Sequence, residues 1–176
     1  MLSVQHLHPG NFALVMASGI ISIGMGLLGN HVLADILFLF AGCAWVALVV
    51  LSLMRLVRFG PQLRDELLNP RMVFSYFTLV AATDIVGMLL LDRGYASFAI
   101  ACWIIAFGVW CSLLYLAFSV LTFLSHEHNV NIVHGGWLIT IVGTQSLVLL
   151  GSRIAPLLGQ YAGYMMVEVH MLWGLG

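Results

Sequence analysis

The sequence has no lysine and very little charge of either sign. Only 7% of its 176 residues are charged, and six arginines against seven acidic residues leave a formal net charge of −1. A nucleic-acid partner requires a basic surface, so this composition argues against one. The chain is instead 62% hydrophobic, more than soluble globular domains of this length show. We therefore expect an integral membrane protein in contact with the lipid bilayer.

Cysteine and proline are also scarce, and their positions exclude further kinds of site. The cysteines lie in apolar runs, share no CxxC spacing and are odd in number; they are Cys43, Cys102 and Cys111. We expect packed thiols rather than a disulfide or a zinc site, with no metal and no cofactor. The prolines lie in loops or at helix starts, where the missing N–H matters little: Pro9, Pro61, Pro70 and Pro156.

Apolar runs long enough to cross a bilayer recur along the chain. A helix of about 20 apolar residues spans the hydrocarbon core and satisfies its own backbone polar groups there. We expect five complete spans and part of a sixth, at about residues 10–29, 33–54, 72–91, 97–123, 136–152 and 160–176. The first lacks the charged start and cleavage pattern of a signal peptide, so it should be retained. The predicted fold is an all-α, multi-pass integral membrane bundle of helical hairpins, one transmembrane domain over residues 1–176.

The arginines predict the orientation of this bundle. Four of the six lie in one short segment between the second and third spans: Arg55, Arg58, Arg64 and Arg71. Loops rich in arginine stay on the cytoplasmic side, so this segment and the N-terminus should be cytoplasmic, in a plasma or inner membrane. Arg93 and Arg153 then fall on the outer side.

The spans alternate in composition. Odd spans are rich in small and hydroxylated residues, with one stripe of Ser18, Ser22, Gly26 and Gly29 and another of Gly136, Thr140, Thr144 and Gly151. Even spans are bulky and aromatic. Small residues allow close helix packing in a bilayer, so each stripe could mark a tight contact or face a cavity. Because three alternate spans share the feature, we expect small-residue odd helices inside and bulky even helices outside.

One acidic residue lies deep within a predicted span. Asp84 falls about a dozen residues into the third span, where an unpaired charge costs several kcal/mol. It should therefore face the bundle interior, be protonated, or both. Two interpretations stay open: a neutral acid that bonds a neighbouring helix, and a proton-coupling or gating group in a substrate path.

A polar triplet interrupts the fifth span. Thr144, Gln145 and Ser146 are spaced about 100° apart around a helix, so they cannot all face one cavity. Thr144 continues the small-residue stripe, and Ser146 is expected to bond the carbonyl of Val142, four residues back. Gln145 is predicted to make an interhelical contact, with Asp84 a possible partner.

Histidines and acids elsewhere in the chain do not form an enzyme site. Glu168 and His170 are two residues apart and point in different directions on a helix, and a bis-histidine haem site lacks partners. The loop histidines near residue 130 do not follow the HExxH pattern; the cluster comprises His126, Glu127, His128 and His134. No serine has a nucleophile motif. We expect no enzyme activity.

Three stretches resemble one transporter family. They are "HPGNFALVMASGIISIG", "FTLVAATDIVG" and "GGWLITIVGTQSLVLLG", in the first, third and fifth spans. They resemble the tellurite-resistance and C4-dicarboxylate transporter family, which includes TehA-like proteins, malate permeases, sulfite exporters and plant slow anion channels. The resemblance implies ten helices in five hairpins, often as homotrimers, that pass small anions: dicarboxylates, sulfite, halides or nitrate. The pore-facing residues it implies are Ser18, Ser22, Gly26, Ser75, Thr78, Ala82, Thr140 and Thr144.

The chain is shorter than that family pattern. It ends at Gly176, partway through the sixth expected helix, so one copy could not close a five-hairpin pore. We expect a fragment that does not transport alone, although several copies or a second chain could complete the structure. The expected function is transmembrane transport of small anions as a channel or carrier. The alternative is an assembly subunit or membrane enzyme without transport activity.

Overall fold

A computed structural model describes residues 8–69, 72–124 and 137–176, and within these ranges it contains helices and turns but no strand. The long helices are α1 (Ala13–Leu27), α2 (His31–Arg58), α4 (Phe77–Asp92), α5 (Ala96–Ser119), α6 (Leu138–Ile154) and α7 (Ala162–Leu175). The shorter elements are η2 (Pro9–Phe12), α3 (Gly60–Leu67), η3 (Val73–Tyr76), η4 (Val120–Leu124) and η7 (Ala155–Tyr161).

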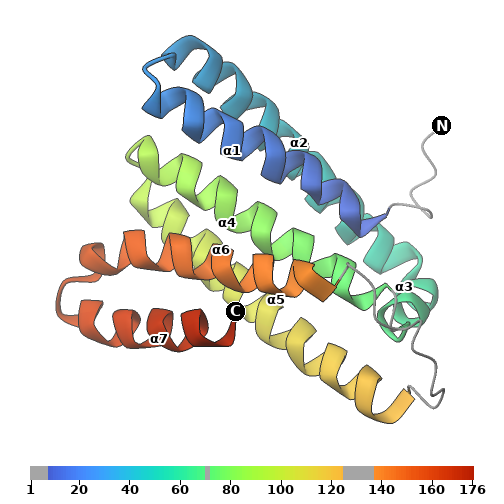
Figure 1. Cartoon of the computed structure of the whole chain (residues 1–176). Coiled ribbons are helices and arrows are strands. Elements are labelled where there is room, and N and C mark those ends of the chain that lie inside the picture. The colour runs from blue at the N-terminus through green and yellow to red at the C-terminus, as the bar shows by residue number, and fades with distance from the viewer. Residues whose placement is uncertain (1–7, 70–71, 125–136) are drawn as a thin grey trace.

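Six of these helices form three antiparallel hairpins that lie side by side: α1 with α2, α4 with α5, and α6 with α7 (Figure 1). All three hairpin turns lie at one end of the bundle, and α3 lies at the other. Gly29 and Gly94 close the first two turns with φ of 80° and 84°, a backbone conformation that glycine adopts without steric penalty. The end with the turns is the one expected to face outward.

The membrane spans confirm the predicted fold class. Five helical stretches are long and apolar enough to cross a bilayer: Pro9–Leu27, His31–Arg58, Val73–Asp92, Ala96–Thr122 and Leu138–Leu175. The last contains two antiparallel helices, and its second helix, α7, has only 14 residues. This agrees with five complete spans and part of a sixth.

Two differences from the expected boundaries lie at the end of the bundle that holds α3. The second helix was expected to end near residue 54, but α2 continues to Arg58. Arg55 and Arg58 occupy its last turn, where positive side chains interact favourably with the helix dipole. The sequence also did not predict α3, an eight-residue amphipathic helix that begins at Gly60 and Pro61.

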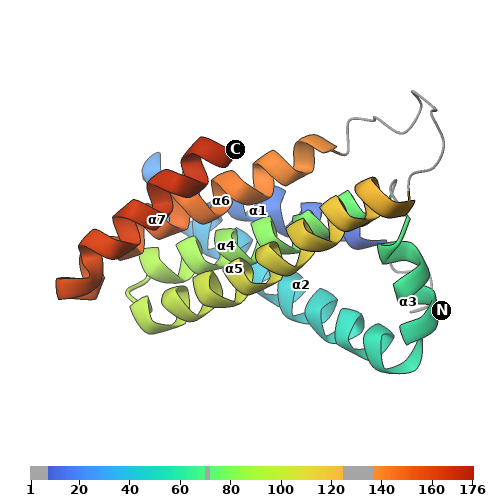
Figure 2. The ribbon, with the colours of Figure 1, turned by 90° about the horizontal axis from the view of Figure 1, so that it is seen from below.

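Helix α4 lies at the centre of the described bundle. Every residue from Val80 to Leu89 is buried, and the helix packs against α1, α2, α5 and α6. In Figure 2, α6 and α7 lie along one side of α4 and α2 lies along the other. Only a few residues of α2 are buried, and its large apolar side chains are turned outward. For α4 and α2 this matches the expectation of small-residue helices inside and bulky helices outside, whereas α1 and α5 are buried to the same extent.

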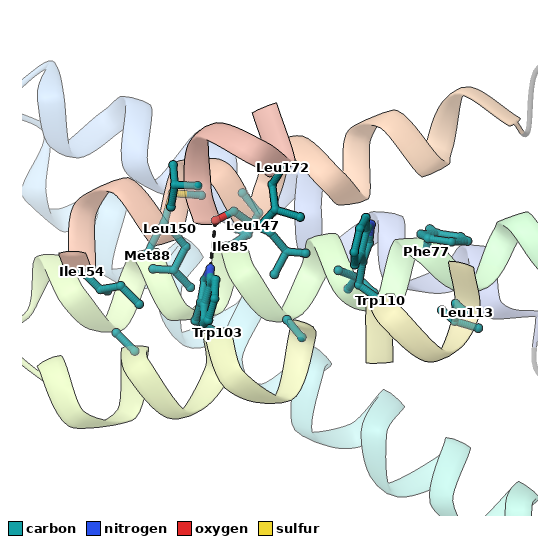
Figure 3. Close-up of a cluster of buried hydrophobic side chains, with 14 of the residues drawn as sticks. Phe77, Ile85, Met88, Trp103, Trp110, Leu113, Leu147, Leu150, Ile154 and Leu172 are labelled. Atoms are coloured by element: carbon teal, nitrogen blue, oxygen red, sulfur yellow. Dashed lines mark hydrogen bonds between the residues drawn. The ribbon is translucent and has the colours of Figure 1, made fainter. Parts of the chain in front are cut away.

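Glycines allow the close approach of α4 to its neighbours. A Cβ at Gly87 would lie 2.5 Å from Leu150 Cδ2 on α6 and 3.2 Å from Cys102 Cβ on α5. Around this contact, aromatic and aliphatic side chains of α4, α5, α6 and α7 form the main apolar core (Figure 3). At Gly87, the absence of a side chain therefore allows α4 to pack tightly against α5 and α6.

Candidate functional site

The small-residue stripe of α1 was expected to line a substrate path. Ser22 Oγ donates a 2.6 Å hydrogen bond to the carbonyl of Ala34 on α2, and Ser18 Oγ donates a 2.7 Å bond to Leu14 O of its own helix. Gly26 differs from the packed glycines, because the nearest atom to a Cβ there would be that of Ala34, at 4.0 Å. The end of the stripe near the hairpin turn therefore faces open space.

That space is a cavity of about 350 Å³ between the α1–α2 hairpin and the end of α4. Ser22 and Gly26, two of the predicted path residues, line it. Its charged and titratable lining consists of His31, Asp35, Asp92 and Arg93. The cavity thus has a mixed lining of charged and apolar side chains and lies at the end of the bundle that carries the hairpin turns.

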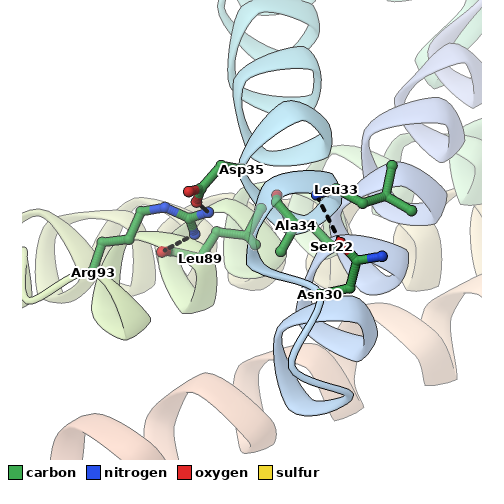
Figure 4. Close-up of polar contacts among 7 residues, drawn as sticks. All are labelled: Ser22, Asn30, Leu33, Ala34, Asp35, Leu89 and Arg93. Atoms are coloured by element: carbon green, nitrogen blue, oxygen red, sulfur yellow. Dashed lines mark hydrogen bonds and ion pairs between the residues drawn. The ribbon is translucent and has the colours of Figure 1, made fainter.

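Arg93 is held beside this cavity by three contacts, and Figure 4 shows the two hydrogen bonds. Its Nη2 donates to Asp35 Oδ1 at 2.7 Å, and its Nη1 donates to the carbonyl of Leu89 at 3.2 Å. The guanidinium also lies 3.7 Å from the centre of the Phe38 ring, a cation–π contact. From the sequence, Arg93 was expected on the outer side of the membrane, and no role in a site was predicted for it. Arg93 directly follows an apolar span, and this position could have indicated a charged group at the mouth of a path.

The predicted path residues of α4 contact α1 and the preceding turn. Thr78 Oγ1, in the first turn of α4, lies 2.7 Å from Ser75 O in η3 and 2.8 Å from Pro9 O in η2. Ala82 is fully buried and belongs to a small apolar cluster with Phe12 and Val15. The structure therefore places these side chains in the contact between α4 and the N-terminal hairpin, and their role in a path stays a prediction.

On α6, the hydroxyl of Thr144 has protein partners on both sides. It accepts a 3.0 Å bond from Trp110 Nε1 on α5 and donates a 2.9 Å bond to Thr140 O. The Thr140 hydroxyl is buried and has no hydrogen-bond partner among the described residues. Of the two predicted path residues on α6, Thr140 thus has the hydroxyl that is open to a further partner.

Asp84 is fully buried, and its partner is Ser146 rather than Gln145. Ser146 Oγ lies 2.7 Å from Asp84 Oδ2 and 2.8 Å from Gly143 O, so the expected bond to Val142 is replaced by one to the carbonyl three residues back. Gln145 instead packs beside Gly176 at the end of α7. The sequence suggested a polar contact between the third and fifth spans, but it assigned the wrong member of the triplet.

The hydrogen bonds around Ser146 accommodate two protonation states of Asp84. A hydroxyl carries one proton, and a carbonyl can only accept. If Ser146 donates to Gly143 O, the proton between Ser146 and Asp84 belongs to a protonated carboxyl; if Ser146 donates to Asp84 Oδ2, that oxygen carries no proton, as in an ionised carboxylate. Asp84 Oδ1 has no partner among the described residues. The two states therefore differ by one proton on Asp84 and by the direction in which the Ser146 hydroxyl donates.

Tryptophans of the outer helices bond to the inner helices in a repeated pattern that sequence reasoning missed. Trp45 on α2 donates to Thr83 Oγ1 of α4 at 3.1 Å, and Trp103 on α5 donates to Leu147 O of α6 at 2.9 Å. Trp110 donates to Thr144 in the same way. The seven-residue spacing of Trp103 and Trp110, which places both on one helical face, was the available signal.

The opposite end of the bundle holds a second charged cluster. Arg55 on α2 forms an ion pair with Glu66 on α3, and Tyr76 donates a 2.9 Å hydrogen bond to the same carboxylate. The cluster therefore ties α3 to both the end of α2 and the start of α4.

Other predicted groups are not brought together. His170 is exposed and bonds Met166 O of its own helix, and no cluster of metal ligands occurs among residues 8–69, 72–124 and 137–176. Cys102 is buried, but Cys43 and Cys111 are exposed rather than packed. Several residues named from the sequence lie outside the described ranges: Arg71, His126, Glu127, His128, His134 and Gly136.

The fold and the cavity define a class: a multi-pass helical membrane protein with polar groups along and at the end of its inner helices. A family model described as voltage-dependent anion channel (SLAC1) matches residues 6–176, almost the whole chain. The chain belongs to this family, whose members are anion channels and transporters rather than enzymes. The resemblance drawn from the three motifs is thereby confirmed. No curated protein and no solved structure showed significant similarity to the chain.

Proposed function

We propose that the protein passes small anions across the plasma or inner membrane, along a path that begins at the cavity beside Gly26 and Arg93. The observation that carries this proposal is that one cavity, of about 350 Å³, is lined by two predicted path residues and by an arginine at the end of a span. An entering anion would meet the guanidinium donors of Arg93 in a lining whose charges are paired, Arg93 with Asp35 and Asp92 with Arg153. The N-terminus is cytoplasmic in this proposal, so the cavity faces outward.

The chemistry of the inner helices suits release as well as entry. Within the described ranges the arginines lie at or beyond the ends of the helices, so no fixed positive charge lies midway along α1, α4 or α6. Conduction requires binding that is favourable but weak enough for the ion to leave. Hydroxyls such as that of Thr140 meet this requirement better than a buried guanidinium.

The candidate substrates are those of the wider family: C4-dicarboxylates such as malate, sulfite, halides and nitrate. Because a single copy is not expected to transport alone, a homo-oligomer whose copies complete the path, with a trimer as the form that the resemblance implies, is part of the proposal. Native mass spectrometry of the detergent-solubilised protein measures that oligomeric state directly. Competition among the four anion classes measures the substrate preference.

Asp84 is the proposed proton-coupling or gating group. The support is its complete burial and the two hydrogen-bond arrangements that Ser146 allows. Asp84→Asn removes the titration and keeps the size of the side chain, so it should alter the pH dependence of anion flux. An unchanged pH profile would assign Asp84 a structural role only.

The path is tested by placing a large side chain at Gly26, where the cavity has room for it. Gly26→Phe should fill the cavity and reduce anion flux at least about ten-fold, since the aromatic ring would occupy the space that the ion needs. Gly108→Phe is the matched control, because Gly108 is exposed on α5 and a Cβ there would meet no atom within 4 Å. Flux is measured in membrane vesicles from cells that express the chain. Equal flux in the two variants, or no flux above empty vesicles for all four anions, would contradict the proposal.

A further inference from the structure

Two apolar hollows lie beside α3, at the opposite end of the bundle from the cavity. The first, of about 230 Å³, is lined mainly by leucines of α2 and α3, with Phe12 and Leu113 from other elements. The second, of about 290 Å³, lies between α3 and α5. The two share Leu56, Leu63 and Leu67, so they adjoin one another under α3.

The first hollow opens at the outer surface of the described bundle. Its floor is buried, with Phe12 at 2% and Leu113 at 8% exposure, whereas Leu53 and Leu56 at its rim are 56% and 54% exposed. A mostly apolar hollow offers too few hydrogen-bond partners to hold water stably. In a bilayer, the group that fits such a space is a hydrocarbon chain.

Positive charge stands next to these hollows. Arg64 lines the second hollow, and both Arg58 and Arg64 are exposed with no ion-pair partner in the described part of the chain. Asp65 and Glu66 are the nearby carboxylates, and Glu66 is bonded to Arg55 and Tyr76. Arginine guanidinium groups match the geometry of phosphate oxygens.

We propose that an anionic phospholipid of the cytoplasmic leaflet binds at α3, with one acyl chain in the two hollows and its phosphate on Arg64. The site combines an apolar slot open to the bilayer with a guanidinium at its edge, in the arginine-rich end of the bundle. Basic pockets on the cytoplasmic side of membrane helices recognise anionic headgroups in this way. This inference does not depend on the anion path.

Binding there would stabilise more than α3 itself. Leu63 and Leu67 are one helical turn apart and face the hollows, while Glu66 on the same helix connects to Arg55 and Tyr76. A lipid that holds α3 in place therefore also holds the connection from the end of α2 to the start of α4. The unfolding temperature of the whole chain is consequently a suitable measurement.

The test is thermal unfolding of the purified full chain in detergent, with added phosphatidylglycerol or phosphatidylcholine. Phosphatidylglycerol should raise the unfolding temperature more than phosphatidylcholine does. Arg64→Gln should weaken phosphatidylglycerol binding about five-fold, the effect of one arginine near an anionic lipid. Arg153→Gln is the control, because Arg153 is an exposed arginine at the opposite end, and it should keep the lipid preference.

A second pair of variants tests the hollow. Leu63→Trp should fill it and reduce stabilisation by both lipids, and Leu56→Trp at the exposed rim should do the same without disturbing a buried position. Equal stabilisation by the two lipids, or an unchanged preference in Arg64→Gln, would overturn the headgroup assignment. Undiminished lipid stabilisation in Leu56→Trp would overturn the acyl-chain assignment. None of these measurements involves anion flux, so their failure is separate from failure of the proposed function.

Discussion

Ser146 Oγ on α6 and Asp84 Oδ2 on α4 lie 2.7 Å apart in a fully buried contact. The pair joins the centres of two helices that the sequence identified as inner helices. Asp84 Oδ1 has no hydrogen-bond partner among the described residues, so Ser146 supplies the hydrogen bond that the buried carboxyl makes.

Ser146→Ala should destabilise the protein by about 1–3 kcal/mol, because it leaves a buried carboxyl without its hydrogen-bond partner. Asp84→Asn should cost less, since an amide can donate to Ser146 as a protonated carboxyl does. Ser112→Ala is the control, because Ser112 is exposed and bonds only a carbonyl of its own helix. Thermal unfolding in detergent compares the three variants. A larger effect of Asp84→Asn than of Ser146→Ala would show that the ionised carboxylate is required for stability.

Gly87→Ala should destabilise the bundle by about 1–3 kcal/mol, because the added methyl group would overlap Leu150 and crowd Cys102. Gly108→Ala adds the same methyl group on an exposed helical face and should stabilise by up to about 1 kcal/mol through helix propensity. The unfolding temperatures of the two variants should therefore shift in opposite directions. Shifts of the same sign and size would mean that the α4 contacts are looser than the structure shows.

Trp110→Phe and Thr144→Val each remove one side of the hydrogen bond between α5 and α6. Hydrogen bonds between membrane helices contribute about 0.6 kcal/mol on average and rarely more than about 1.7 kcal/mol. A double-mutant cycle should give a coupling energy in that range. Trp173→Phe serves as the control for loss of an indole, because Trp173 is 67% exposed, and it should leave stability unchanged. A coupling energy of zero would contradict the bond.

Glu66→Gln should destabilise the protein by about 1–3 kcal/mol, because Arg55 is only 4% exposed and loses a charged partner. Asp35→Asn also removes an ion-pair partner of an arginine, but Asp35 is 68% exposed, so its loss should cost less than about 1 kcal/mol. Unfolding in low and high salt distinguishes the two pairs, since only the exposed pair should respond to screening. Equal losses in both variants would contradict the difference in burial.

Hydropathy and residue size were sufficient to predict the class, the approximate spans and the inner position of the third helix. These properties follow from chain segments of about 20 residues, which average over local detail. The sequence could not place α3, because eight residues with two leucines give too short a periodic pattern. It also could not select Ser146 over Gln145 as the partner of Asp84, because that choice depends on the rotation of α6 about its own axis. The Trp110–Thr144 bond was unpredictable for the same reason, as it requires the relative depth of two helices.

The separation of 62 positions between Asp84 and Ser146 has a consequence for biosynthesis. At about 5–20 residues per second, a ribosome needs roughly 3–12 s to add the serine after the aspartate has been made. During that interval the third helix must enter the membrane, or wait beside the insertion machinery, with its carboxyl group unmatched. An aspartate at the centre of a helix makes insertion less favourable by about 3 kcal/mol, so we expect the newly made helix to stay beside the insertion machinery until α6 arrives. Ribosome-bound chains that end between α4 and α6 should therefore remain sensitive to extraction from the membrane, and those that extend past Ser146 should resist it.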